Sequence, residues 1–324
     1  MLIGFEKADF SALCDLWNRF YPPKYAIDEA VLRYNTTECP LHDWGASIVH
    51  LTEGKPDAFL AVKKSASSLF KGPDPDSAFI SALAFENASS AIDLFAYAKQ
   101  ILRNRGVYKL VFGQDWQHFF PGCPMDAPGL VNLLTIEGFE MGALQWDVEM
   151  DLADYSCGAE KVAVLGKWPG SVIDDPDKPA VEFASEKWIP ELSRFLAAEF
   201  PGRWEYVSKS LFEREEDLSQ IAVLHQSGRV EGFAVTQSTA STARIAGAVF
   251  HLGLGENWGA LGPIGVSKSV RGQGLGDALL AASLLGMKAK GVRRCTIDWT
   301  TLTDWYGSHG FEKSKEYAAF SLTL

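Results

Sequence analysis

The order of predicted helices and strands in the first half of the chain occurs again in the second half. Each half shows an amphipathic helix, a hairpin, a further strand, a long helix, another strand, and a closing Gly-Phe pair with a strand after it. Periodicity and turn signals place these elements at 10–20, 47–62, 78–85, 90–104 and 108–112, and again at 189–200, 221–237, 258–267, 274–290 and 294–299. We therefore predict two divergent copies of one fold rather than one large domain.

A stretch rich in glycine, proline and aspartate separates the two copies. Residues 153–180 lose regular periodicity, which predicts a linker between a first domain at 1–152 and a second domain at 181–324. The chain has 324 residues, of which 47% are hydrophobic, so it can fill two cores of ordinary size.

The composition excludes several classes of protein. A content of 22% charged residues, together with many aromatic side chains, argues against disorder, and the net charge of −11 opposes nucleic-acid binding. The five cysteines are scattered and never spaced as C-x-x-C, and there is no H-E-x-x-H motif, so we expect neither disulfides nor a metal site. No apolar run is long enough to span a bilayer, and we expect a cytoplasmic protein with no membrane partner.

A glycine-rich segment in the second half is the sharpest local signal. It reads Arg271-Gly272-Gln273-Gly274-Leu275-Gly276, and it lies between an apolar strand and a helical pattern that begins with Asp277. Because glycines let a backbone approach a phosphate closely, the loop amides and the positive end of the following helix can converge on a pyrophosphate. The spacing is neither that of a dinucleotide fingerprint nor that of a nucleotide P-loop. A helix entry that serves only tight packing is the alternative.

Two motifs in this half resemble the GNAT superfamily of acyl-CoA N-acyltransferases. The family pattern of arginine or glutamine, two residues, glycine, one residue, and glycine or alanine is met by Arg271, Gly274 and Gly276. The family segment of aromatic, tyrosine, three residues, glycine and phenylalanine is matched at 305–311. The resemblance is clear over about 258–320. It implies an α/β (α+β) fold of two tandem GNAT-like domains, each with a mixed, mostly antiparallel sheet flanked by helices.

The resemblance also implies a site for acetyl-CoA as co-substrate. The strand end Ile264-Gly265-Val266 is expected to offer backbone groups to the pantetheine arm. The amides of residues 272–277 are expected to hold the pyrophosphate beside the positive charge of Arg271. The acetyl group is then expected to pass to a primary amine of a small molecule by direct attack in a ternary complex.

Two residues are candidates for moving protons in that reaction. Tyr306 has a phenol that is protonated at neutral pH, so it can supply a proton to a departing thiolate; alternatively it only packs on the co-substrate. Asp298, at the end of the strand before Tyr306, is the leading candidate for the base, and a hydrogen-bonded strand-end carboxylate is the alternative. Many relatives have an asparagine in this segment, which leaves the side-chain contacts to the co-substrate open here.

The acceptor is expected to contact the segment between the first helix and the hairpin of the second half. We predict a loop there, with Trp204 as a stacking face and Glu205 as a counter-charge for an amine. An ordinary Pro-Gly turn with packing aromatics is the alternative.

The first half lacks a cofactor loop. Its strand at 80–85 runs into Glu86-Asn87-Ala88-Ser89-Ser90, which has no glycine and places an acidic group where a pyrophosphate would lie. Its segment 114–122 resembles one in bacterial tandem GNAT proteins, where one domain keeps the cofactor and the other acts as a scaffold. We therefore predict a degenerate first copy that shapes the substrate cleft.

These observations together predict an acetyl-CoA-dependent N-acetyltransferase that is a monomer or homodimer. A non-catalytic acyl-CoA sensor or a scaffold module is the alternative, and it would show no turnover with any amine. The presence of both Tyr306 and an uninterrupted glycine-rich loop favours the enzyme. Amino sugar, amino acid, polyamine and antibiotic acceptors stay open, as does the length of the acyl chain.

Overall fold

The computed structural model describes residues 1–65, 76–212 and 215–324, and in them one mixed sheet runs through both halves of the chain. The strands, in the order of the sheet, are β1 (Leu2–Gly4), β2 (Ile48–Thr52), β3 (Lys55–Lys64), β4 (Ser77–Phe85), β5 (Lys109–Phe112), β13 (Glu312–Thr323), β7 (Glu140–Asp151), β12 (Arg294–Thr300), β11 (Trp258–Val266), β10 (Arg229–Ser238), β9 (Ile221–Gln226) and β8 (Ala180–Phe183), with β6 (Cys123–Pro124) beside β13.

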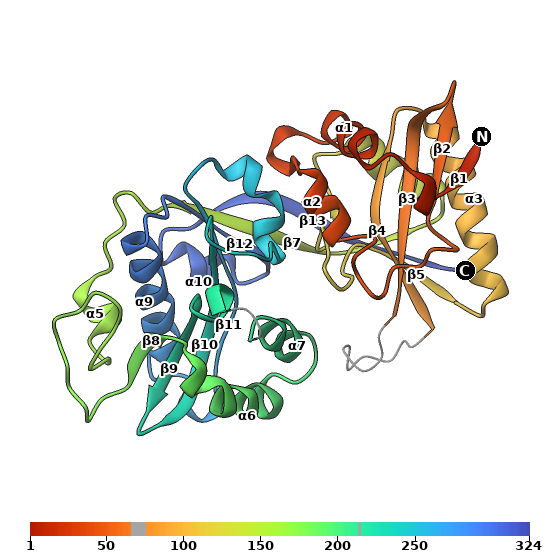
Figure 1. Cartoon of the computed structure of the whole chain (residues 1–324). Helices are drawn as coiled ribbons and strands as arrows, with labels where there is room; N and C mark the ends of the chain where they lie inside the picture. The colour runs from red at the N-terminus through yellow and green to blue at the C-terminus, as the bar shows by residue number, and fades with distance from the viewer. Residues whose placement is uncertain (66–75, 213–214) are drawn as a thin grey trace.

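Helices cover the sheet in both lobes (Figure 1). The α-helices are α1 (Phe10–Phe20), α2 (Glu29–Tyr34), α3 (Ala88–Asn104), α4 (Pro128–Ile136), α5 (Ala159–Val162), α6 (Ile189–Glu199), α7 (Arg203–Ser210), α8 (Glu215–Leu218), α9 (Leu275–Ala289) and α10 (Thr303–Gly307). Short 3₁₀ helices are found at Phe5–Lys7, Pro23–Tyr25, Glu186–Trp188, Ala246–Leu254 and Lys268–Val270. Within these described stretches, no helix has the length and apolar content that a membrane crossing needs.

The last strand of each half belongs to the sheet of the other half. β13 pairs antiparallel with β5, with Phe320 opposite Phe112, and β7 pairs antiparallel with β12, with Glu149 opposite Thr296. The two exchanged strands also pair with each other. Figure 1 shows them crossing between the lobes, so that the C terminus lies in the same lobe as the N terminus. The halves are therefore joined by continuous backbone hydrogen bonding.

The sheet of the second half opens where β11 leaves β12. These strands pair in parallel only from Trp258–Ala260 to Arg294–Thr296, while β11 stays paired with β10 up to Val266. The remaining pairs in this half are antiparallel, which confirms the predicted mixed and mostly antiparallel sheet. The splayed end of β11 leaves one backbone edge without a strand partner among the described residues, and this edge faces the space that forms the candidate site.

Side-chain alternation along β10 explains why helices lie on both faces of this sheet. Phe233 and Val235 belong to the apolar cluster formed with α6, whereas Ala234 belongs to the cluster formed with α9. Successive residues of a strand point to opposite faces of the sheet, so these three consecutive residues contact helices on both faces. The small Ala234 lets α9 approach the sheet closely.

The predicted elements lie within a few residues of the observed ones, and one prediction was wrong. The segment with Trp204 and Glu205 is not a loop but the helix α7. The amide of Tyr206 donates to the carbonyl of Gly202, and Glu205 forms an ion pair with Lys209 one turn later, at 2.6 Å. These local bonds stabilise a helix directly after the Pro-Gly turn, which the turn signal concealed. The predicted linker contains α5, whose Val162 packs with α9.

Candidate functional site

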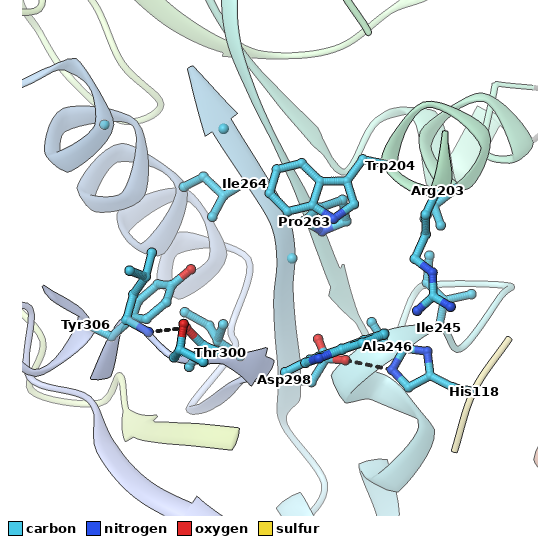
Figure 2. A pocket seen from close by; sticks show the side chains of 18 of the residues that line it. His118, Arg203, Trp204, Ile245, Ala246, Pro263, Ile264, Asp298, Thr300 and Tyr306 are labelled. Atoms are coloured by element: carbon cyan, nitrogen blue, oxygen red, sulfur yellow. Dashed lines mark hydrogen bonds and ion pairs between the residues drawn. The ribbon is translucent and has the colours of Figure 1, made fainter. Parts of the chain in front are cut away.

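A cavity of about 610 Å³ lies between the two halves of the chain. One wall comes from the second half and consists of the splayed end of β11, the end of β12, and α10. The opposite wall consists of α7 and a loop of the first half that carries Trp116, Gln117 and His118. Figure 2 shows Tyr306 on one side of this space and His118 with Arg203 on the other, with Asp298 between them.

The glycine-rich segment lies at the entrance to α9 on the rim of this cavity. Gly272 has φ +75° and Gly274 has φ +78°, a left-handed conformation that glycine adopts at low cost. A Cβ built on Gly272 would meet no atom within 4 Å, and one on Gly276 would only touch Trp305 at 4.0 Å. The backbone is therefore open to a ligand at the positive end of a 15-residue helix.

The remaining residues of this segment divide between cavity, core and surface. Arg271 and Gly276 line the cavity. Leu275 is buried in the core beneath α9, and the side chain of Gln273 donates to the carbonyl of Ser269 at 3.1 Å. Asp277 accepts hydrogen bonds from Trp305 of α10 and from His309, which follows this helix. Burial raises the pKa of Asp277, but these bonds outweigh it and hold the pKa below its usual value.

The splayed strand end Ile264-Gly265-Val266 lines the cavity as well. The ring of Phe200 supports Gly265 from behind, since a Cβ on this glycine would lie 2.4 Å from the ring. Any larger side chain would push the strand out of place. Close packing against Phe200 therefore explains why a glycine is found at position 265, and the backbone of Gly265 lines the cavity.

The corresponding place in the first half is filled by aromatic side chains. β4 and β11 are both nine-residue strands, so Leu83 of β4 corresponds to Ile264 of β11. The hydroxyl of Tyr21 donates to the carbonyl of Leu83 at 2.7 Å, and the rings of Phe20 and Phe85 pack at 4.6 Å. The hydroxyl of Tyr21 therefore occupies, at Leu83, the backbone edge that stays open in the second half.

Tyr306 is buried in the wall formed by α10. Its ring packs against Trp305 at 4.7 Å and against Phe311 at 5.8 Å. Burial raises the pKa of the Tyr306 phenol, and the negative charge of Asp298 raises it further. Both effects disfavour the phenolate, so the hydroxyl keeps its proton at neutral pH.

Asp298 extends from β12 into the floor of the cavity. Its Oδ2 lies 3.1 Å from Nε2 of His118, a residue 180 positions earlier in the chain. Its other oxygen faces β11, since a Cβ built on Gly262 would lie 3.7 Å from Oδ1. The carboxylate is thus held by the first half and directed toward the splayed strand of the second.

Of the two predicted acceptor contacts, only Trp204 lines the cavity. Glu205 lies on another side of α7 in its ion pair with Lys209. The neighbouring Arg203, which the sequence analysis did not single out, has its guanidinium 4.6 Å from the ring of Trp299. Burial lowers the pKa of Arg203 to about 10, against the opposing charges of Asp115 and Asp298, so it stays positive at neutral pH.

Within residues 1–65, 76–212 and 215–324, no group of three or more His, Cys, Asp or Glu side chains is placed to hold a metal ion. The five cysteines are all free in the structure.

A family of known proteins matches part of the second half in sequence. The sequence model described as "Acetyltransferase (GNAT) family" matches residues 189–311, which include the glycine-rich segment, Asp298 and Tyr306. The matched residues 189–311 are less than half of the chain, so the similarity to the GNAT family is shown for this part of the second half. No curated protein matches the sequence.

Solved structures of GNAT proteins match the whole chain. A GCN5-related glucosamine N-acetyltransferase region in a fungal multi-domain GH3 beta-N-acetylglucosaminidase is similar with a TM-score of 0.83 and 19% identity. The match covers 99% of this chain but only 38% of that protein. A GCN5-related N-acetyltransferase from Sphaerobacter thermophilus gives 0.67 at 15% identity, covering 100% of this chain and 95% of that one. A tandem GNAT protein from the clavulanic acid biosynthesis pathway gives 0.65 at 13% identity, covering 100% and 98%.

These likenesses show that the chain has a tandem GNAT fold over its full length. The family match, in contrast, stays within the second half, where both sequence motifs lie. Sequence reasoning missed the cavity residues of the first half, above all His118. The only signal available for them was the segment 114–122, which was interpreted as part of a scaffold.

Proposed function

We propose that the chain is an N-acetyltransferase that moves an acetyl group from acetyl-CoA to a primary amine of a small molecule by direct attack in a ternary complex. The observation that carries this proposal is a single cavity that brings together the glycine-rich entrance of α9, the open edge of β11, Asp298 and Tyr306. The similarity to the GNAT family supports acyl transfer as the reaction class.

The proposed acetyl-CoA site fits the shape of the backbone. Arg271 and the amides of residues 272–277 would hold the pyrophosphate, because Gly272 and Gly276 leave open space at the positive end of α9. The open edge of Ile264-Gly265-Val266 would pair with the amide groups of the pantetheine arm. When bound, acetyl-CoA supplies an acetyl thioester, whose carbonyl carbon is the site of attack.

Two side chains of this chain would manage the protons. The amine nitrogen forms a bond to the acetyl carbon, the carbon–sulfur bond breaks, the nitrogen loses a proton, and the sulfur gains one. Tyr306 holds the proton for the sulfur at its hydroxyl, and Asp298 accepts from the amine. The raised pKa of Tyr306 keeps its hydroxyl protonated at neutral pH, so the proton is present when the carbon–sulfur bond breaks.

The acceptor side of the cavity suits a small amine with a ring-shaped body. Trp116, Trp204 and Trp299 line the cavity, and Asp298 supplies one negative charge for an amine. The fungal relative is described as a glucosamine N-acetyltransferase region, so we propose an amino sugar as the first acceptor to test. Polyamines, amino acids and aminoglycoside antibiotics form the rest of the panel.

The proposal is tested by a charge placed in the co-substrate site. Gly276→Glu puts a carboxylate at the proposed pyrophosphate position without backbone strain, because Gly276 does not have a positive φ. Acetyl-CoA affinity measured by calorimetry should fall by about 100-fold or more, since two like charges would face each other. The matched control is Gly129→Glu, which changes the second residue of α4, where a Cβ meets nothing within 4 Å.

Thiol release measured with the amine panel then separates the enzyme from its alternative. A protein that binds acetyl-CoA and releases CoA only when an amine is present is the proposed transferase. Binding without release for every amine would instead indicate an acyl-CoA sensor. Equal binding by wild type and Gly276→Glu would contradict the proposed site.

A further inference from the structure

The first half reaches into the proposed active site through one loop. His118 of this loop lines the cavity, and its Nε2 lies 3.1 Å from Oδ2 of Asp298 on β12. Both side chains are almost buried, with 11% and 12% of their surface exposed. The ring of His118 is also fixed edge-on against Trp299, at 5.0 Å between ring centroids. The contact is therefore an ordered pair inside the cavity rather than a chance surface approach.

A buried ion pair holds this loop in place. Nζ of Lys63 lies 2.5 Å from Oδ2 of Asp115, and neither side chain is exposed. The same ammonium donates to the carbonyls of Trp116 at 2.7 Å and Gln117 at 2.9 Å, and the hydroxyl of Ser81 donates to Asp115 at 2.8 Å. A buried ammonium with these three partners tolerates little movement, because losing one would leave part of its charge uncompensated.

The second half also fixes the loop. The guanidinium of Arg203 on α7 donates to the carbonyl of Asp115 at 2.7 Å. Lys63 of the first half and Arg203 of the second half therefore both hold the backbone of this loop by hydrogen bonds. These hydrogen bonds are made to the carbonyls of residues 115–117, directly before His118, so they fix the orientation of its imidazole in the cavity.

We propose that His118 is a positioning residue for Asp298, so that the first half completes the acceptor side of the active site instead of serving as a scaffold alone. This inference rests on the proposed function. By holding Oδ2, His118 leaves Oδ1 directed at Gly262 on the splayed strand, where the amine and the thioester would meet. A free carboxylate would rotate among several orientations, and most of them would misplace the oxygen that accepts from the amine.

Two substitutions of His118 separate this role from simple packing. His118→Gln keeps a side-chain nitrogen near the position of Nε2 and therefore a hydrogen bond to Asp298. His118→Phe keeps the ring and its contact with Trp299 but removes the hydrogen bond. We expect His118→Phe to lower kcat by about 10- to 100-fold with acetyl-CoA affinity unchanged, and His118→Gln to keep most of the activity. The control is His225→Phe, another half-buried histidine, which packs on Trp188 near Glu182 and lies outside the cavity.

A double-mutant cycle tests whether His118 acts through Asp298. In an Asp298→Asn background, His118→Phe should cause little further loss, because the group that it positions is already gone. Any of four results would overturn the inference and leave the proposed function standing: normal turnover by His118→Phe, equal losses for Gln and Phe at position 118, the same loss for His118→Phe in both backgrounds, or weakened acetyl-CoA binding by His118→Phe. A wild type that acetylates no amine would overturn the proposed function and this inference with it.

Discussion

At the scale of single residues, the protonation of Tyr306 follows from where its hydroxyl lies. Burial removes water that would stabilise a phenolate, and Asp298 adds a nearby negative charge. Each effect raises the pKa of an acid, so the protonated form persists into the alkaline range. The hydroxyl of Tyr306 therefore keeps its proton at neutral and mildly alkaline pH.

Tyr306→Phe therefore tests the donor. If the phenol supplies the proton for the leaving sulfur, kcat should fall by about 10²- to 10⁴-fold, and the dissociation constant of acetyl-CoA should change little. Any loss of wild-type kcat between pH 8 and about pH 10 should have another origin, because Tyr306 stays protonated there. The control is Tyr155→Phe, which removes another phenol whose pKa is raised by burial. Equal kcat for wild type and Tyr306→Phe would remove the donor role.

Local sequence patterns predicted one side of the site and not the other. Arg271, Gly276 and Tyr306 lie in short motifs of the second half, and Asp298 ends the strand between these motifs. The structure places all four on one cavity. His118 is 180 positions from Asp298, so no local spacing connects them. Trp204 lines the cavity while its neighbour Glu205 does not, because successive side chains of α7 point about 100° apart around the helix axis. A predicted loop at this place does not distinguish the two side chains.

At the scale of elements, strand exchange is the feature that periodicity could not reveal. Alternation predicts that a segment is a strand and which residues face the core, but it does not name the neighbouring strand. β13 reads as the closing strand of the second half, yet its Phe320 is buried among side chains of the first half and pairs with Phe112. Because apolar residues alternate similarly in both halves, the local pattern of β13 does not indicate whether it pairs with strands of the first half or of the second half.

Phe320→Ala reports which half depends on β13. The substitution should cost about 3 to 5 kcal/mol of stability, as expected when a buried phenylalanine is truncated. Amide exchange should accelerate in β4 and β5, although these strands are some 200 residues away in the chain. Phe233→Ala on β10 is the matched control, and its effect should fall on β9 and α6. Acceleration confined to the second half in both variants would contradict the exchanged arrangement.

At the scale of the whole molecule, the exchange makes each half incomplete without the other. A cut in the predicted linker would leave residues 1–172 and 173–324, and each piece would retain the strand that completes the other's sheet. Val172 is fully exposed, so a protease site inserted there can be cleaved without disturbing the sheet. The pairings of β7 with β12, β7 with β13, and β13 with β5 all cross the cut.

We expect the nicked protein to elute as one species in size-exclusion chromatography and to keep its affinity for acetyl-CoA. These three ladders, the short pairing of β13 with β6, and a shared cavity hold the pieces together. The missing covalent link removes only the entropy benefit of one chain. Denaturant should separate the pieces, and it should do so at a lower concentration when the nicked chain carries Phe320→Ala than when it carries Phe233→Ala, since only Phe320 lies on a strand that joins the halves. Separation of the unmodified pieces in native buffer would mean that the exchanged strands contribute little and that the linker holds the molecule together.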